Sequence, residues 1–152
     1  MGSRRWIALG FLATLLVFPV AAQPVAPNPP ANPQNGDELP TPIANVLRRL
    51  TRALAEQDDT AAQDIFSMDM PQYLRLVGQF QSLIAREMTN STIEVVRQEG
   101  DDEHRTAQLD WLMQAGTNPP KRAIVTVNFA KVNGEWRIVG FDPIDWFGVD
   151  TQ

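Results

Sequence analysis

The sequence predicts an α+β domain in which three N-terminal helices pack on a strongly curved antiparallel sheet of about four strands. Apolar residues recur at helical spacing between residues 43 and 88, and at alternate positions between residues 92 and 141. The pair Asn133-Gly134 separates the last two alternating segments and is a strong signal for a two-residue hairpin turn. Helices that precede a run of antiparallel strands define the α+β class.

The N-terminal segment has the layout of an export signal. A basic stretch at residues 3–5 precedes an uncharged apolar run at residues 6–20, and Ala21 and Ala22 supply small residues for cleavage. The apolar run is shorter than the roughly 20 residues of a membrane span. We therefore expect a signal peptide over residues 1–22, cleaved after Ala22, and a periplasmic or secreted protein. An uncleaved anchor is the alternative, and the basic pair leaves both the general secretory and the twin-arginine routes open.

Residues 23–42 contain seven prolines and predict a disordered linker that is extended and solvated. It would serve either as a spacer or as a docking segment for a polyproline-binding partner. One domain, residues 43–148, and a short tail, residues 149–152, complete the chain. A domain of roughly this length holds a single core.

The composition of the chain excludes several kinds of binding and catalysis. The chain has 13 basic and 18 acidic residues, and loss of Arg4 and Arg5 with the signal leaves a mature charge of −7. Such a chain is a poor candidate for binding nucleic acid or anionic membranes. The absence of cysteine excludes disulfides and thiol catalysis, and the single histidine, His104, excludes multi-histidine metal sites. We expect no metal, no cofactor and no stable membrane span after cleavage.

The first helix is expected to open with Thr41 as cap and Pro42 at its first position. Its arginines lie off the apolar stripe, so they are either solvated or face an acidic partner; they are Arg48, Arg49 and Arg52. A short helix over residues 61–66 follows. A third begins near Met70, and Gly78 within it either costs stability or permits close packing. The third stripe is Tyr73, Leu76, Val77, Phe80, Leu83, Ile84 and Met88.

Four strands are expected at residues 92–98, 105–115, 121–132 and 135–141, followed by an aromatic tail at residues 144–147. Alternation places Trp111 and Trp136 inside. The opposite face carries side chains that are apolar for a solvated surface, namely Leu112, Ile124, Thr126, Asn128 and Ala130. That outer face suits an isologous contact and predicts a homodimer.

The segment from Ala123 to Pro143, with Asn133-Gly134-Glu-Trp-Arg-Ile at its turn, resembles the last hairpin of the nuclear transport factor 2-like superfamily. The first two helices are similar to that family's opening, so the resemblance covers about residues 43–147. It implies a cone in which helices close one side of a curved sheet around a cavity, and it is closest to uncharacterised exported members. Family members include steroid isomerases, polyketide cyclases, dehydratases, transport receptors and exported modules of unknown role, and the fold does not choose among these functions.

Two functions remain open. The first is a non-catalytic binding module, either a homodimer or a holder of a small apolar ligand, whose pocket lining would be Tyr73, Phe80, Trp111, Met113, Phe129 and Trp136. The second is a cone-site acid-base enzyme of the isomerase, cyclase or hydrolase type. Its only candidate pair is Asp110 as base and Tyr73 as hydrogen-bond donor. Strand parity turns Asp110 to the outer face, where Arg137 could pair with it, unless a bulge reverses the alternation.

Overall fold

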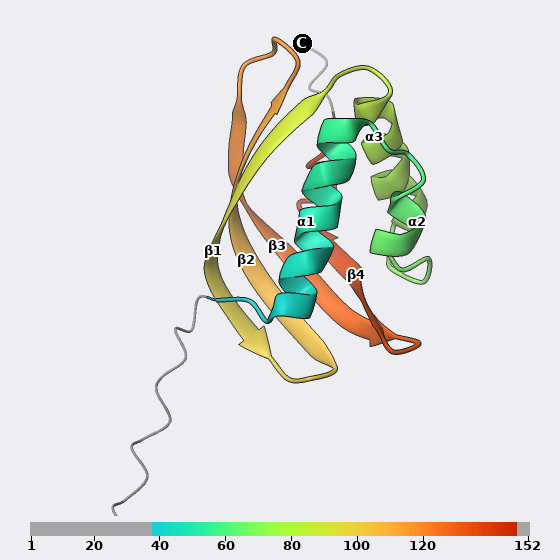
Figure 1. The fold of residues 1–152 in the computed structure, drawn as a ribbon, viewed down its shortest axis with the longest axis vertical. Coiled ribbons are helices and arrows are strands. Elements are labelled where there is room, and N and C mark those ends of the chain that lie inside the picture. The colour runs from blue at the N-terminus through green and yellow to red at the C-terminus, as the bar shows by residue number, and fades with distance from the viewer. Residues whose placement is uncertain (1–37, 149–152) are drawn as a thin grey trace, which may run out of the picture. The chain divides into compact units, whose positions relative to one another are not determined.

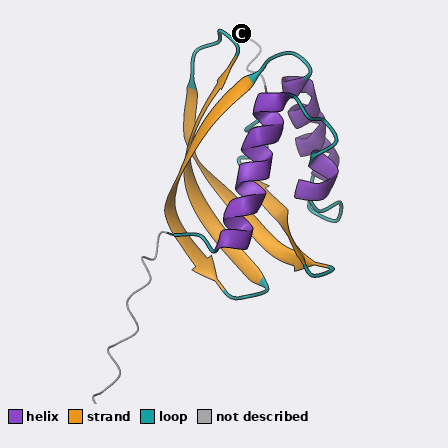
Figure 2. Cartoon of the chain, viewed as in Figure 1, coloured by secondary structure: helices purple, strands orange, loops and turns teal. Residues whose placement is uncertain are grey.

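The computed structural model describes residues 38–148. The predicted signal peptide, most of the linker and the tail at residues 149–152 lie outside the described residues. Three helices precede four strands: α1 (Thr41–Glu56), α2 (Ala62–Ile65), α3 (Tyr73–Ile84), β1 (Thr89–Gly100), β2 (His104–Ala115), β3 (Lys121–Val132) and β4 (Glu135–Asp142). The strands form one antiparallel sheet in the order β1-β2-β3-β4. All three helices lie on one side of this curved sheet, which confirms the predicted α+β fold (Figures 1 and 2).

The start of α1 differs from the prediction. Thr41 is the first helical residue, not the cap, and Pro40 occupies the cap position without a side-chain hydrogen bond. The Pro40 carbonyl instead accepts the amides of Ile43 and Ala44 at 2.9 and 3.0 Å. Because Leu39 is also buried and α1 begins at Thr41, the ordered domain begins before residue 43. Residues 39–42 therefore belong to the domain and not to the predicted linker.

The apolar stripes of the helices pack as predicted except at Met88, and the close packing considered for Gly78 does not occur. Met88 is 65% exposed because α3 ends at Ile84, so the helical spacing no longer governs its direction. Gly78 does not permit a close approach, since a Cβ atom built there meets nothing within 4 Å. The buried stripe of α3 is Leu76, Val77, Phe80, Leu83 and Ile84.

The sheet confirms most of the predicted directions of the strand side chains. Trp111 is completely buried, whereas Trp136 is only half-buried, with Lys131 Nζ 5.6 Å from its ring centroid. Trp136 therefore lies at the rim of the core, beside the exposed hairpin turn at Asn133-Gly134, where both residues have positive φ. Ala130 was expected on the outer face but is buried, because its small side chain lies between the paired residues His104 and Arg137.

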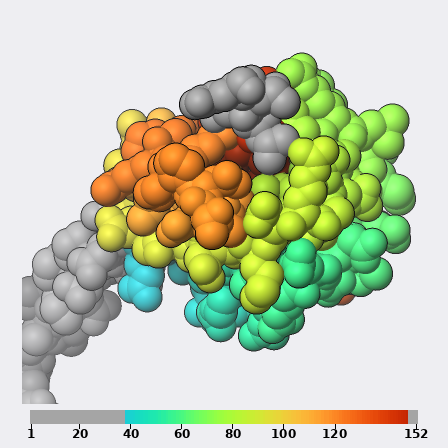
Figure 3. Space-filling model, turned by 90° about the horizontal axis from the view of Figure 1, so that it is seen from above, coloured from blue at the N-terminus to red at the C-terminus, as the bar shows by residue number. Residues whose placement is uncertain are grey.

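The interior of the cone is filled by the segment after β4. Trp146 and Phe147 are each 1% exposed and pack on Trp111, with ring centroids 5.9 Å away in both cases. Asp145 fastens the segment to α3 by accepting hydrogen bonds from Arg75 at 2.8 Å and Gln79 at 2.7 Å. In the space-filling view, red atoms of the C-terminal segment show between the orange and the yellow-green parts of the chain (Figure 3).

Lys121 holds the same segment from the sheet side. Its Nζ donates to the Trp146 carbonyl at 3.0 Å and lies 4.9 Å from the centroid of that indole ring. The cone is thus packed by its own C-terminal aromatic residues, which are tied to both α3 and β3.

Candidate functional site

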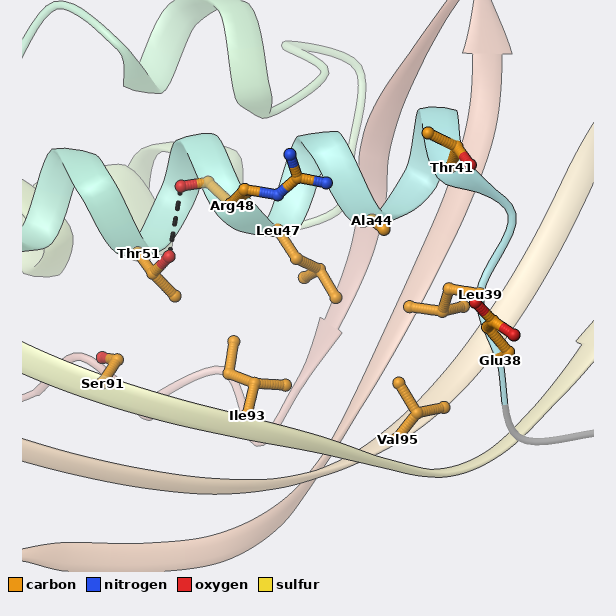
Figure 4. Close-up of a pocket in the computed structure, with 10 residues that line it drawn as sticks. All are labelled: Glu38, Leu39, Thr41, Ala44, Leu47, Arg48, Thr51, Ser91, Ile93 and Val95. Carbon is orange, nitrogen blue, oxygen red and sulfur yellow. Dashed lines mark hydrogen bonds between the residues drawn. The ribbon is translucent and has the colours of Figure 1, made fainter.

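An open groove lies between α1 and the inward face of β1, and we call it the α1–β1 groove. It holds about 790 Å³ of open space. The helix contributes Ala44, Leu47, Arg48 and Thr51, the strand contributes Ser91, Ile93 and Val95, and Glu38, Leu39 and Thr41 stand at one end. Figure 4 shows the strand side chains pointing toward the helix and Leu47 pointing toward the strand.

The flank of α1 that faces β1 carries small residues beside Leu47 and Arg48, and these small residues leave the groove open. Ala44, Thr51 and Ala55 lie on this flank, and none is long enough to reach the strand. Leu47 reaches toward the strand, whereas the other large apolar residues of α1 are buried in the core (Figure 4). The inward face of β1 is consequently half-covered: Ile93 and Val95 are partly buried, whereas their partners on β2 are completely buried.

The groove continues past the edge of β1 into a polar region. Its lining combines polar side chains with Ala55, Leu112 and Pro120; the polar ones are Arg48, Thr51 and Arg52 from α1 and Asn90, Ser91, Thr92 and Gln114 from the strands. Arg48 runs along the surface of α1 at the rim of the groove (Figure 4), and the Thr51 hydroxyl donates to the Arg48 carbonyl at 3.1 Å. The groove thus has one end near Leu39 and Val95, where Glu38 also stands, and one polar end near Ser91, while the Arg48 guanidinium is turned toward Ala44.

The Ser91 hydroxyl is the buried polar atom of this site. Its Oγ is shielded from solvent and has no hydrogen-bond partner in the structure. Buried hydroxyls are normally paired, because an unmet hydrogen bond costs roughly 1–3 kcal/mol. Because the Ser91 Oγ is shielded, a ligand in the open groove would not reach it without a local rearrangement.

The six residues predicted to line a pocket lie in the core or at its margin. Phe80, Trp111, Met113 and Phe129 are buried in the packed core, and Tyr73 and Trp136 lie half-buried at its margin. Two of them pack against the aromatic segment at residues 144–147: Phe80 contacts Phe147, and Trp111 contacts Trp146 and Phe147. The α1–β1 groove has an entirely different lining.

The structure does not bring Asp110 and Tyr73 together. β2 pairs regularly with β3 through Asp110, so no bulge reverses its parity, and Asp110 stays on the outer face. Its carboxylate accepts two hydrogen bonds from Arg122, at 2.8 and 2.7 Å. The Arg122 guanidinium lowers the pKa of Asp110, which is the opposite of what a cone-site base requires.

The expected partner of Asp110 was wrong. Arg137 donates to the Gln63 carbonyl at 2.7 Å and lies 3.5 Å from Glu135. It pairs with Ala130, which in turn pairs with His104, so Arg137 stands at the far end of β2 from Asp110. Arg122 is closer because it is a diagonal neighbour of Asp110 on the same face.

His104 is exposed at the start of β2, as expected for a turn residue. Its backbone amide donates to Asp101 at 2.7 Å, and this bond, with a second from the Glu103 amide, lowers the Asp101 pKa. Residues 38–148 contain no cluster of three or more side chains able to hold a metal ion. Within the same range, no helix is long and apolar enough to cross a membrane.

Fold and site define a class: an α+β cone whose interior is packed and whose open groove lies between the first helix and the first strand. The chain has the nuclear transport factor 2-like fold, also called cystatin-like, as comparison with solved structures shows. No family model matches the chain, and no curated protein sequence matches it significantly.

Three solved structures illustrate the likeness. A nuclear transport factor 2-like protein of unknown function from Shewanella oneidensis aligns with a TM-score of 0.58 at 9% identity, over 66% of this chain and 93% of that one. A cystatin-like protein of unknown function from Nostoc punctiforme aligns with 0.50 at 16%, over 66% and 89%. Bd1075 from Bdellovibrio bacteriovorus aligns with 0.58 at 8%, over 66% of this chain but only 38% of its own length. At such identities the likeness establishes the fold alone.

Sequence reasoning had identified parts of the groove without joining them. Arg48 and Arg52 were seen as basic residues off the apolar stripe, and Ile93 and Val95 as one face of a strand. The signal that could have linked them is the small flank of α1 at Ala44, Thr51 and Ala55. The groove itself depends on how far α1 stands from β1, which no local pattern encodes.

Proposed function

We propose that the chain is an exported, non-catalytic binding module that holds a small, largely apolar ligand in the α1–β1 groove. One observation carries the proposal. On the same face of the sheet, Leu109 and Trp111 are completely buried, whereas their β1 partners Val95 and Ile93 are only half-covered. The core face therefore extends beyond the part that the helices cover. The proposed ligand position is this flank of the cone, not the packed interior.

An apolar ligand would complete the cover of that face. Burial of apolar surface is favourable by about 25 cal/mol per Å². The walls Leu39, Leu47, Ile93 and Val95 offer such surface, and the polar end offers a few groups that would fix orientation. This combination of mostly apolar walls with few polar groups is typical of small-molecule sites.

A neutral solvatochromic dye such as Nile red tests the site. We expect saturable fluorescence enhancement with the wild-type domain and loss of it in Ala44→Phe, whose ring would occupy the groove. Asn45→Phe is the matched control, because it adds the same ring to an exposed position of α1 outside the groove. Equal dye binding by Ala44→Phe and the wild type would refute the groove as the ligand site.

The outer face of the sheet supports a second proposal, a homodimer. Ile124 is 52% exposed and Leu112 is 39% exposed, and both lie on this face with the Asp110–Arg122 ion pair. Two large apolar side chains beside a fixed charge pair suit a self-complementary contact. The matching experiment is given with the predictions below.

The acid-base enzyme alternative has less support. Its candidate base, Asp110, is engaged by Arg122 on the outer face, and its candidate donor, Tyr73, lies at the start of α3 on the helix side. Export rests on residues 1–22 alone. The intact mass of the exported protein tests it: we expect a chain that begins at Gln23, and a mass that retains residues 6–20 would indicate a membrane anchor instead.

A further inference from the structure

We infer that the α1–β1 groove takes an extended peptide that adds to the free edge of β1 as an antiparallel strand, with apolar side chains facing the groove and a basic side chain on the outer face. The inference rests on the proposed function, since it names the ligand class of the same groove. Three observations between residues 38 and 148 lead to it: unpaired backbone groups along the groove, an uncovered sheet edge, and a carboxylate at that edge without an ion-pair partner.

The backbone of β1 directs hydrogen-bonding groups along the groove. β1 is an edge strand, so only one side of it pairs with β2. The Gly116 amide donates to the Met88 carbonyl at 3.0 Å, which makes these two residues a hydrogen-bonded pair. Because bonded and non-bonded pairs alternate along antiparallel strands, the even-numbered residues in the range 90–94 also bond to β2. The odd-numbered residues turn their N–H and C=O groups to the free edge, namely Ser91, Ile93 and Val95.

The same three residues form the floor of the groove. Their side chains point toward α1 (Figure 4), and Ile93 and Val95 are only partly buried. In an added strand, the residue directly opposite each of them has its side chain on the same face of the sheet. An extended peptide would thus place every second side chain on the α1 side of the sheet, beside the half-covered floor. A ligand without amides would cover this floor but would leave the outward backbone groups to water.

The free edge of β1 lacks the usual protection of an edge strand. Edge strands are commonly short, or carry lysine, proline or a bulge. Residues 89–95 contain neither lysine nor proline, and the register shift comes only after Val95. On β4, at the opposite edge, Phe66 forms a bridge with Ile138, and the Ser67 amide donates to the Ile138 carbonyl at 2.8 Å. No backbone group between residues 38 and 148 covers the free edge of β1 in this way. Its regular part therefore accepts a peptide of about six residues.

Glu94 sets the charge of the peptide. It lies directly opposite Asp110 of β2, on the outer face of the sheet. The Arg122 guanidinium is bonded to Asp110, and Glu94 forms no ion pair with any residue between 38 and 148. A basic side chain opposite Glu94 on an added strand would be its cross-strand partner, and the acidic net charge of the chain favours the approach of a basic peptide. Residues 89–95 hold no basic residue, so the same stretch of a second copy would not complement Glu94.

NMR titration of the isotope-labelled protein with an end-blocked peptide, Thr-Val-Lys-Val-Thr-Val, tests the inference. When this peptide pairs antiparallel with β1, its valines face the groove and its lysine lies opposite Glu94. We expect saturable shifts of the amide signals of Ser91, Ile93 and Val95, and slower hydrogen exchange at these amides. Ala44→Phe should abolish the binding, and Asn45→Phe is again the matched control.

Two N-methylated forms of the peptide distinguish strand addition from apolar contact alone. A methyl group on the amide of the middle valine removes the donor that faces Ile93, and we expect at least about tenfold weaker binding. A methyl group on the amide of the second threonine is the matched control, because that amide points away from β1. It should change the affinity by less than about twofold.

A change of charge tests the role of Glu94. Replacement of the peptide lysine by glutamine should weaken binding by about two- to fivefold, as expected for an exposed ion pair. This difference should vanish in Glu94→Gln. It should persist in Glu56→Gln, which removes an exposed carboxylate at the end of α1. A lysine preference that survives in Glu94→Gln would overturn the assigned register.

The outcomes separate this inference from the proposed function. If Nile red binds in the groove but the peptide does not, or if both N-methylated peptides bind equally well, the inference fails and the groove remains a ligand site. Signals of Ser91, Ile93 and Val95 that shift with protein concentration alone would show a second copy on this edge and would also overturn it. If Ala44→Phe binds the dye as well as the wild type does, the proposed function fails, and this inference fails with it.

Discussion

Replacing Trp111 with alanine should destabilise the domain far more than replacing Trp136. Trp111 is completely buried and contacts the rings of Phe141, Trp146 and Phe147 at centroid distances of 6.0, 5.9 and 5.9 Å. Large-to-small changes of this kind cost about 3–5 kcal/mol. The Trp111 Nε1 atom has no hydrogen-bond partner, so its removal recovers part of that cost. We therefore expect a loss near the lower limit, about 3 kcal/mol.

Urea denaturation followed by far-UV circular dichroism measures this loss without relying on tryptophan fluorescence. With a slope of about 1–1.5 kcal/mol/M for a small domain, the midpoint should fall by about 2–3 M. Trp136→Ala should cost about 1 kcal/mol, because that ring is already half-exposed. Trp111→Phe keeps an aromatic ring and serves if the alanine variant does not fold. A loss below about 1 kcal/mol for Trp111→Ala, or equal losses at both positions, would refute the packing described for the cone.

Three further changes test other parts of the structure. Gly78→Ala should stabilise by roughly 0.5–1 kcal/mol in the same denaturation assay, because the new methyl group meets no neighbour and helix propensity improves; a destabilised variant would contradict the open position. Ile124→Arg should lower the molar mass measured by light scattering from that of the proposed homodimer to that of a monomer. A wild-type protein that is already monomeric would refute the proposal. Hydrogen bonds from Gln79 and Arg75 lower the Asp145 pKa from 3.8, so its contribution to stability is present above that pH and is lost as the pH falls through the folded-state value. Asp145→Asn should therefore lower the thermal midpoint at pH 7, and the gap to the wild type should close in acid; a gap that is constant with pH would exclude this charge effect.

Local periodicity was sufficient to predict most of the fold. The stripes of α1 and α3 and the alternation of β2 and β3 were correct because each reports which face of an element is buried, and burial follows the spacing of the side chains. The hairpin at Asn133-Gly134 was correct because few residue pairs tolerate two positive φ values.

Periodicity could not predict what covers each face. Trp111 and Trp136 both fit an inward pattern, but only Trp111 lies where the segment at residues 144–147 returns to the sheet. The sequence predicted an aromatic tail at these residues but not the side chains against which it packs. The groove could not be predicted for the same reason. Ser91 and Arg48 are 43 positions apart in the sequence, and they line one groove only because of how α1 and β1 pack.

The aromatic segment after β4 also constrains the order in which the domain can be completed. Trp146 and Phe147 follow every other core residue along the chain. A nascent chain that has reached the end of β4 therefore contains every helix and strand described between residues 38 and 148 but leaves the Trp111 indole without two of its partners. Such an intermediate exposes aromatic surface, which favours aggregation or capture by chaperones. Final closure of the core must wait for residues 146 and 147, so truncation or a bulky fusion immediately after β4 would trap the domain at that stage.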